Sequence, residues 1–210
     1  MNSFVFVKHE KIKPAREKLE KMILELQTEV KPFINFQYMI SSAAGNNMIT
    51  CDRIRNIGFD FEYDLLPHCD FRKYPPDQII RILRDGLSRL CDRYSYKLYD
   101  DYDGVISLKQ ITDPEIYFNC PIYHSCDFLI CRRSGHPQII SYDKKANIYF
   151  WENQPEDYDD LQEKIDYLRS INQWTAVRHK YINLKNNDDI GLRSRFLLLK
   201  AVNFVYDEFK

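Results

Sequence analysis

The chain has 210 residues, of which 44% are hydrophobic and 29% charged, a composition typical of a globular protein that is long enough to bury a core. Its formal net charge is −1, which excludes a strongly basic protein that would bind nucleic acid over its whole surface. No apolar run is long enough to span a membrane, and the six cysteines, which form no Cys-x-x-Cys pair, indicate thiols in a reducing cytoplasm.

The first 50 residues predict a helix, a strand and a loop. Apolar residues recur at helical spacing over residues 10–30 and predict a helix that Pro32 ends. Residues 33–40, FINFQYMI, predict a strand. Residues 41–50, SSAAGNNMIT, predict a small flexible loop, because such residues leave backbone N–H groups exposed.

An acidic strand is predicted next, over residues 57–67, IGFDFEYDLLP. Side chains two residues apart share one face of a strand, so Asp60 and Glu62 are neighbours about 7 Å apart, while Phe59 and Phe61 point into a core. Carboxylates this close repel unless a positive group lies between them, and Mg²⁺ prefers such hard oxygen ligands. The alternative is that one face of the strand is simply solvated.

The middle of the chain predicts one helix and four strands. An amphipathic helix opens at residues 75–77 and carries its apolar face to Cys91. The predicted strands are residues 104–111 and 122–131, followed by a hairpin of residues 139–143 and 147–151. Asp127 lies inside the apolar run CDFLIC, where burial of a lone carboxylate would be costly.

After Pro155 the pattern becomes wholly helical, with helices predicted over residues 159–171, 174–185 and 192–209. The sequence therefore predicts an α+β fold, a mixed β-sheet flanked by helices, with residues 1–155 as the α/β core and residues 156–210 as a C-terminal helical subdomain. The last predicted helix is apolar on more than one face, and the second apolar face is a candidate interface for a homodimer.

The loop, the acid pair and the third acid together resemble the nucleotidyltransferase superfamily, to which DNA polymerase beta, the tRNA CCA-adding enzymes and the bacterial cyclic-oligonucleotide synthases belong. The chain is more narrowly similar to a group of uncharacterised bacterial nucleotidyltransferase-like proteins, between about residues 36 and 206. The segments that carry this likeness are NNMIT, IGFDFEYDL, HSCDFLIC, YDKKANIYFWENQP, YLRSINQWTAVRHKYINLKNND and RSRFLLLKAVNFVY.

The resemblance implies metal-dependent transfer of a nucleotidyl group from an NTP to a hydroxyl, with release of pyrophosphate. Asp60, Glu62 and Asp127 would be the catalytic residues and would bind Mg²⁺ or Mn²⁺, and the third acid would activate the attacking hydroxyl. The acceptor is left open among RNA, a nucleotide, a protein side chain and a small molecule. The residues that would bind the nucleotide are Ser41, Ser42, Gly45, Asn46, Asn47, Lys109 and Lys144.

Several positions depart from the superfamily pattern. Its Gly-Ser pair falls on Ser42 and Ala43 or, in a second alignment, on Gly45 and Asn46. The second acid is Glu62 where Asp is more usual, and the arginines of related proteins are replaced at Asn46 and Gly104. These departures favour an alternative, a catalytically impaired protein of the same fold that binds a nucleotide or a protein partner. A metal-dependent nuclease is a further alternative, because nucleases also cluster carboxylates.

Overall fold

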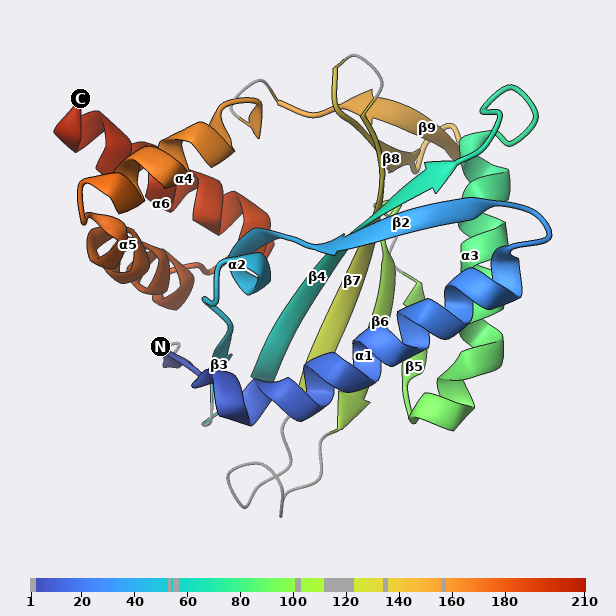
Figure 1. Cartoon of the computed structure of the whole chain (residues 1–210), viewed down its shortest axis with the longest axis horizontal. Helices are drawn as coiled ribbons and strands as arrows, with labels where there is room; N and C mark the ends of the chain where they lie inside the picture. The colour runs from blue at the N-terminus through green and yellow to red at the C-terminus, as the bar shows by residue number, and fades with distance from the viewer. Residues whose placement is uncertain are drawn as a thin grey trace.

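The structure is a computed structural model of the whole chain (Figure 1), and it describes residues 3–52, 54, 57–100, 103–111, 123–133, 136–155 and 158–210. Over these residues the chain forms six helices and one nine-stranded sheet. The architecture is α+β with helices at the C-terminal end, as predicted. Within the same ranges, no helix combines the length and the apolar character that a membrane span requires.

The sheet is mixed. Its order is β1-β3-β4-β7-β6-β5, with β2 also paired to β4, β8 to β7 and β9 to β8. β4 and β7 run parallel, and the other pairings between described strands are antiparallel. The strands are β1 (Phe4–Phe6), β2 (Asn35–Ile40), β3 (Thr50–Asp52), β4 (Ile57–His68), β5 (Lys97–Asp100), β6 (Ile106–Ile111), β7 (Tyr123–Arg132), β8 (Gln138–Asp143) and β9 (Ile148–Asn153).

Two helices, α1 (His9–Val30) and α3 (Pro76–Tyr94), pack with the apolar residues of β4 in one core. β4 contributes Phe59, Phe61, Tyr63 and Leu65, each fully or almost fully buried. Gly86 lets the two helices approach closely, because a Cβ at that position would lie 2.6 Å from Leu26 Cδ1. The alternation of apolar and acidic residues in β4 therefore gives one face of this strand to the main core.

The remaining long helices are α4 (Leu161–Ser170), α5 (Trp174–Asn186) and α6 (Ser194–Phe209), which gather at the left of Figure 1, away from α3. They form a second apolar cluster that also contains Ala43 and Met48. Both residues come from the segment predicted to be a loop, so that segment packs onto the C-terminal helices. The domain boundary between residues 155 and 156 stays a prediction.

The long elements follow the sequence pattern closely. The first helix, the acidic strand, the strand around Asp127 and the hairpin are all confirmed, the last with Asp143 paired to Ile148. The predicted loop contains a short helix, α2 (Ser42–Gly45). The strands β1, β3 and β5 were not predicted, because three or four residues are too few to establish a two-residue period.

Candidate functional site

The three predicted acids converge on one cavity. Glu62 of β4 lies opposite Asp127 of β7 in the parallel register, and Asp60 lies opposite Ser125. Asp60, Glu62 and Asp127 all line a cavity of about 410 Å³, together with Lys185 of α5 and residues of the α5–α6 connection. Asp127 and Glu62, which are 65 residues apart in the sequence, are thus neighbours because β4 and β7 are adjacent parallel strands.

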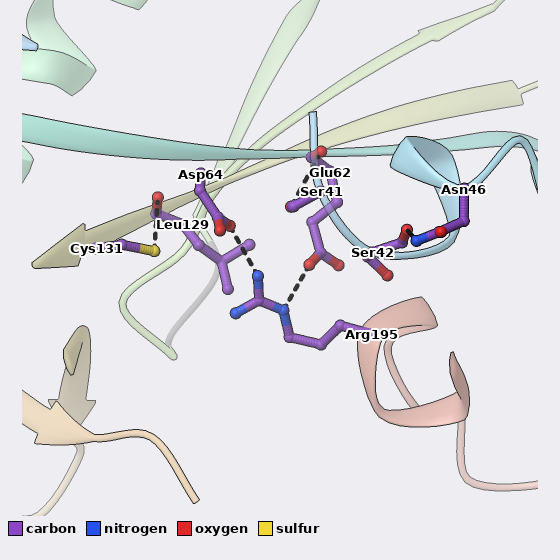
Figure 2. Close-up of polar contacts among 8 residues, drawn as sticks. All are labelled: Ser41, Ser42, Asn46, Glu62, Asp64, Leu129, Cys131 and Arg195. Carbon is purple, nitrogen blue, oxygen red and sulfur yellow. Dashed lines mark hydrogen bonds and ion pairs between the residues drawn. The ribbon is translucent and has the colours of Figure 1, made fainter. Parts of the chain in front are cut away.

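Two basic side chains from the C-terminal helices contact this acidic face. Arg195 of α6 donates from Nε to Glu62 Oε1 at 2.6 Å and from Nη2 to Asp64 Oδ1 at 2.7 Å (Figure 2). Lys185 Nζ pairs with Asp60 Oδ2 and donates to Ser194 Oγ at 3.2 Å. Each acid on this face of β4 therefore has a basic partner.

These contacts are buried. Glu62 is 4% exposed, Asp64 9%, Lys185 7% and Arg195 8%. A solvated acidic face, the alternative left open by the sequence, is therefore wrong for Glu62 and Asp64. The acidic face is buried because Lys185 of α5 and Arg195 of α6 lie against it.

Burial and charge act in opposite directions on these groups. Burial raises the pKa of Glu62 to about 7, although the charge of Arg195 lowers it. Burial alone would lower the pKa of Lys185 and of Arg195, but the facing carboxylates raise both above their usual values. Lys185 and Arg195 are therefore cations in the folded protein.

The carboxylate set has the right chemistry for Mg²⁺ or Mn²⁺, yet its arrangement does not fit a divalent ion. Across the described part of the chain, no three His, Cys, Asp or Glu side chains form a group that could hold a metal. Asp60 and Glu62 are each engaged by a buried cation, and Asp127 Oδ1 accepts a hydrogen bond from Ser107 Oγ at 2.7 Å. A metal would have to displace both cations, so the predicted metal-binding role of the three acids stays a prediction.

The loop of residues 41–47, which the resemblance predicts to hold the phosphates of a nucleotide, is called the phosphate turn below, and it begins directly beside Glu62. The backbone N–H and the hydroxyl of Ser41 both donate to the carbonyl oxygen of Glu62, at 2.8 and 3.3 Å. Ser42 has φ of 58°, the left-handed conformation that glycine adopts without strain. Gly45 allows a close approach, since a Cβ there would lie 2.9 Å from the Ile40 carbonyl oxygen. Ser42 thus supplies the backbone geometry of a glycine.

A second cavity, of about 330 Å³, lies over this turn. It is lined by Ser41, Ser42, Gly45 and Asn46, by several residues of the C-terminal helices and by Arg133, Arg169 and Arg195. Arg195 lines this cavity while it contacts Glu62, which lines the acidic one, so the Arg195–Glu62 ion pair lies at the boundary between the two.

Arginine charge reaches the turn from the C-terminal helices. Arg169 Nη2 donates to Asn46 Oδ1 at 2.8 Å, and Arg178 Nη1 donates to the carbonyl oxygen of Asn47 at 3.1 Å. Arg169 of α4 thus places a guanidinium directly against the side chain of Asn46.

Three predicted nucleotide-binding residues lie outside both cavities. Asn47 closes the turn with φ of 56°. The ammonium of Lys109 lies 4.6 Å from the centre of the Tyr99 ring, and Lys144 lies 3.8 Å from Asp103 in an exposed hairpin. Their role in nucleotide binding stays a prediction.

Sequence reasoning missed the basic residues from the C-terminal half: Arg133, Arg169, Lys185 and Arg195. A signal was present for two of them. Lys185 continues the buried stripe of Val177 and Tyr181 at four-residue spacing, and Arg195 shares the buried face of Leu198 and Val202. A basic residue on the apolar face of a helix indicates a buried acidic partner.

Known proteins resemble this chain in structure. No family profile and no curated protein matches its sequence. The GTP-bound form of DncV from Vibrio cholerae has a TM-score of 0.54 and 12% identity, over 96% of this chain and 53% of that one. The V. cholerae DncV cyclic AMP-GMP synthase in complex with nonhydrolyzable GTP has a TM-score of 0.55 and 8% identity, over 98% of this chain and 74% of that one. The 3′-deoxy GTP-bound form of Escherichia coli DncV has a TM-score of 0.55 and 12% identity, over 96% of this chain and 54% of that one.

These likenesses establish the fold. DncV is a nucleotidyltransferase of the polymerase beta-like superfamily, and this chain shares that nucleotidyltransferase fold, as the sequence resemblance implied. The chain spans about half the length of the first of these structures.

Proposed function

We propose that this protein binds a nucleoside triphosphate, with the phosphates in the arginine-lined cavity over the phosphate turn. The observation that carries the proposal is the convergence of Arg133, Arg169 and Arg195 on a cavity whose floor is the predicted phosphate turn. Guanidinium groups suit phosphate because their N–H donors lie in a planar fork.

The hydrogen-bonding groups of the turn support the same ligand. Asp64, the acidic residue that lines this cavity, is already paired with Arg195, so the cavity favours an anion. Among the described residues, the buried hydroxyl of Ser42 has no hydrogen-bond partner and is a donor for a phosphate oxygen. The structural neighbours in complex with GTP, nonhydrolyzable GTP and 3′-deoxy GTP support a triphosphate ligand for this chain too.

Metal-dependent nucleotidyl transfer to a hydroxyl acceptor is the second candidate function. It is favoured by the convergence of Asp60, Glu62 and Asp127 on the adjoining cavity. It ranks second because two of the three carboxylates are held by buried cations. Under the first proposal the protein is a catalytically impaired protein of the nucleotidyltransferase fold. It would act in the cytoplasm by binding a nucleotide, without transferring it.

Calorimetric titration with each of the four NTPs tests binding. We expect Arg133→Gln and Arg169→Gln each to weaken binding about tenfold, the loss of one charge-assisted hydrogen bond. Arg81→Gln is the matched control, since Arg81 is exposed on α3 and lines neither cavity. Absence of binding by all four NTPs, or an equal loss in the control, would contradict the proposal.

Incubation with α-labelled NTPs, Mg²⁺ or Mn²⁺, total RNA and lysate separates the two functions. Binding alone predicts no transfer of label and no pyrophosphate. Transfer that disappears in Asp60→Asn would establish the second candidate instead, and cutting of the RNA would indicate a nuclease.

A further inference from the structure

The cations on the acidic face come from positions that normally hold apolar residues. Lys185 lies on the buried stripe of α5 and Arg195 on that of α6, and both reach across to β4. A long basic side chain on a buried stripe is unfavourable unless a carboxylate meets it. Each of the two helices therefore supplies one cation to the acids of β4: Lys185 to Asp60, and Arg195 to Glu62 and Asp64.

The contacts between these cations and the acids of β4 are close. Arg195 engages Glu62 and Asp64 at once, with both contacts at 2.7 Å or less, and none of the three residues is more than 9% exposed. Lys185 is similarly buried and also lies 4.9 Å from the centre of the Phe4 ring. A divalent ion near these oxygens would lie next to two fixed positive charges in a region of low dielectric constant.

The ion pairs point the same way. A divalent ion bridges two carboxylates by neutralising both, and here the ammonium of Lys185 already pairs with Asp60 while the guanidinium of Arg195 is shared between Glu62 and Asp64. Asp127 retains its hydrogen bond from Ser107, so its oxygen is stabilised without a metal.

We infer that Lys185 and Arg195 stand in for the divalent cations implied at the acidic face, so that Asp60, Glu62 and Asp127 bind no metal ion in the native protein. Where the inference extends to nucleotide binding it rests on the proposed function: the triphosphate then binds without Mg²⁺, because the arginines of the adjoining cavity neutralise it.

Titration of the full chain with Mn²⁺, followed by electron paramagnetic resonance of the free ion, tests the metal arm without nucleotide. The native protein is expected to leave the free Mn²⁺ signal unchanged. Lys185→Met combined with Arg195→Met is expected to bind Mn²⁺, because the acids lose their internal cations. Arg195→Lys, which keeps a positive charge, is the control and is expected to remain without metal.

The double variant leaves buried carboxylates without partners, so its stability is measured alongside. We expect Mg²⁺ or Mn²⁺ to raise its thermal midpoint and to leave the native midpoint unchanged, since a ligand that binds only the folded state stabilises it. Stoichiometric Mn²⁺ binding by the native chain that is lost in Asp60→Asn would overturn the inference. So would a folded double variant that neither binds Mn²⁺ nor gains stability from it.

A second experiment tests whether the triphosphate binds without Mg²⁺, by comparing the affinity of the native protein for NTP in EDTA with its affinity in Mg²⁺. Equal affinities within about twofold are expected, and a tenfold gain in Mg²⁺ would overturn the inference. If no NTP binds in either buffer, the proposed function fails, while the Mn²⁺ measurements still decide whether the cations replace the metal.

Discussion

The two faces of β4 have the same backbone and opposite chemistry. One face carries Phe59, Phe61, Tyr63 and Leu65 into the core beneath α1 and α3. The other carries Asp60, Glu62 and Asp64 toward α5 and α6, which meet them with Lys185 and Arg195. Both faces are largely covered, yet the first is covered by apolar contact and the second by ion pairs.

The two faces contribute differently to the free energy of unfolding. Apolar burial stabilises the fold at every atom that leaves water. A buried ion pair roughly balances its desolvation cost, and its strong effect appears only when one partner is removed. The acidic face therefore contributes little net stability, and its value lies in the charges that it holds in place.

The largest expected effect is on the apolar face. Phe59→Ala should lower the free energy of unfolding by about 4 kcal/mol, because it removes a fully buried ring and leaves a cavity. Urea denaturation measures the change. Phe33→Ala, at a ring that is 56% exposed, is the control and should cost about 0.5 kcal/mol. Equal losses in the two variants would contradict the assignment of the core.

Removal of Arg195 comes next. Arg195→Met should cost about 3 kcal/mol, because Glu62 and Asp64 then lose their buried partner. Replacing both acids by leucine as well should recover most of that loss in the same urea measurement. A triple variant no more stable than the single one would mean that the arginine acts by packing and not by charge.

Lys185→Met should cost less, about 2 kcal/mol, because the side chain of Asp60 is 30% exposed and water solvates the carboxylate left behind. Lys200→Met, at an exposed position of α6, is the matched control and should change stability by about 0.5 kcal/mol at most. A thermal melt of the two variants provides the comparison, and an unchanged midpoint in Lys185→Met would show that its ion pair is dispensable.

The smallest effect concerns the third acid. Ser107→Ala removes the hydroxyl that donates to Asp127 and should cost about 1 kcal/mol. Ser107→Thr keeps the hydroxyl and should retain most of that stability. If both variants behave alike in denaturation, the hydrogen bond does not position Asp127.

Much of the fold was predictable because it follows from local patterns. The helical period over α1 and the alternation over β4 are long enough to identify each element and to give its buried face. The convergence of Asp127 with the acid pair was also predicted, through the resemblance. The short strands β1, β3 and β5 were not, since three or four residues are too few to establish a two-residue period.

The site was only half predictable. The acids were visible as an alternating pattern, whereas the helical spacing of Lys185 and Arg195 indicates a buried acidic partner without identifying which acid it is. Their partners lie 125 and 133 residues away and meet them only through tertiary packing. The phosphate turn has the same character, because its arginine, Arg169, comes from α4, 123 residues from Asn46.

The amino-acid sequence by itself determined which face of β4 is apolar and which is acidic, because side chains in a strand alternate whatever surrounds it. Only the tertiary structure decided what neutralises the acids. That choice depends on which charges the C-terminal helices bring within a few ångströms, and electrostatic partners are selected by proximity in space and not by spacing along the chain.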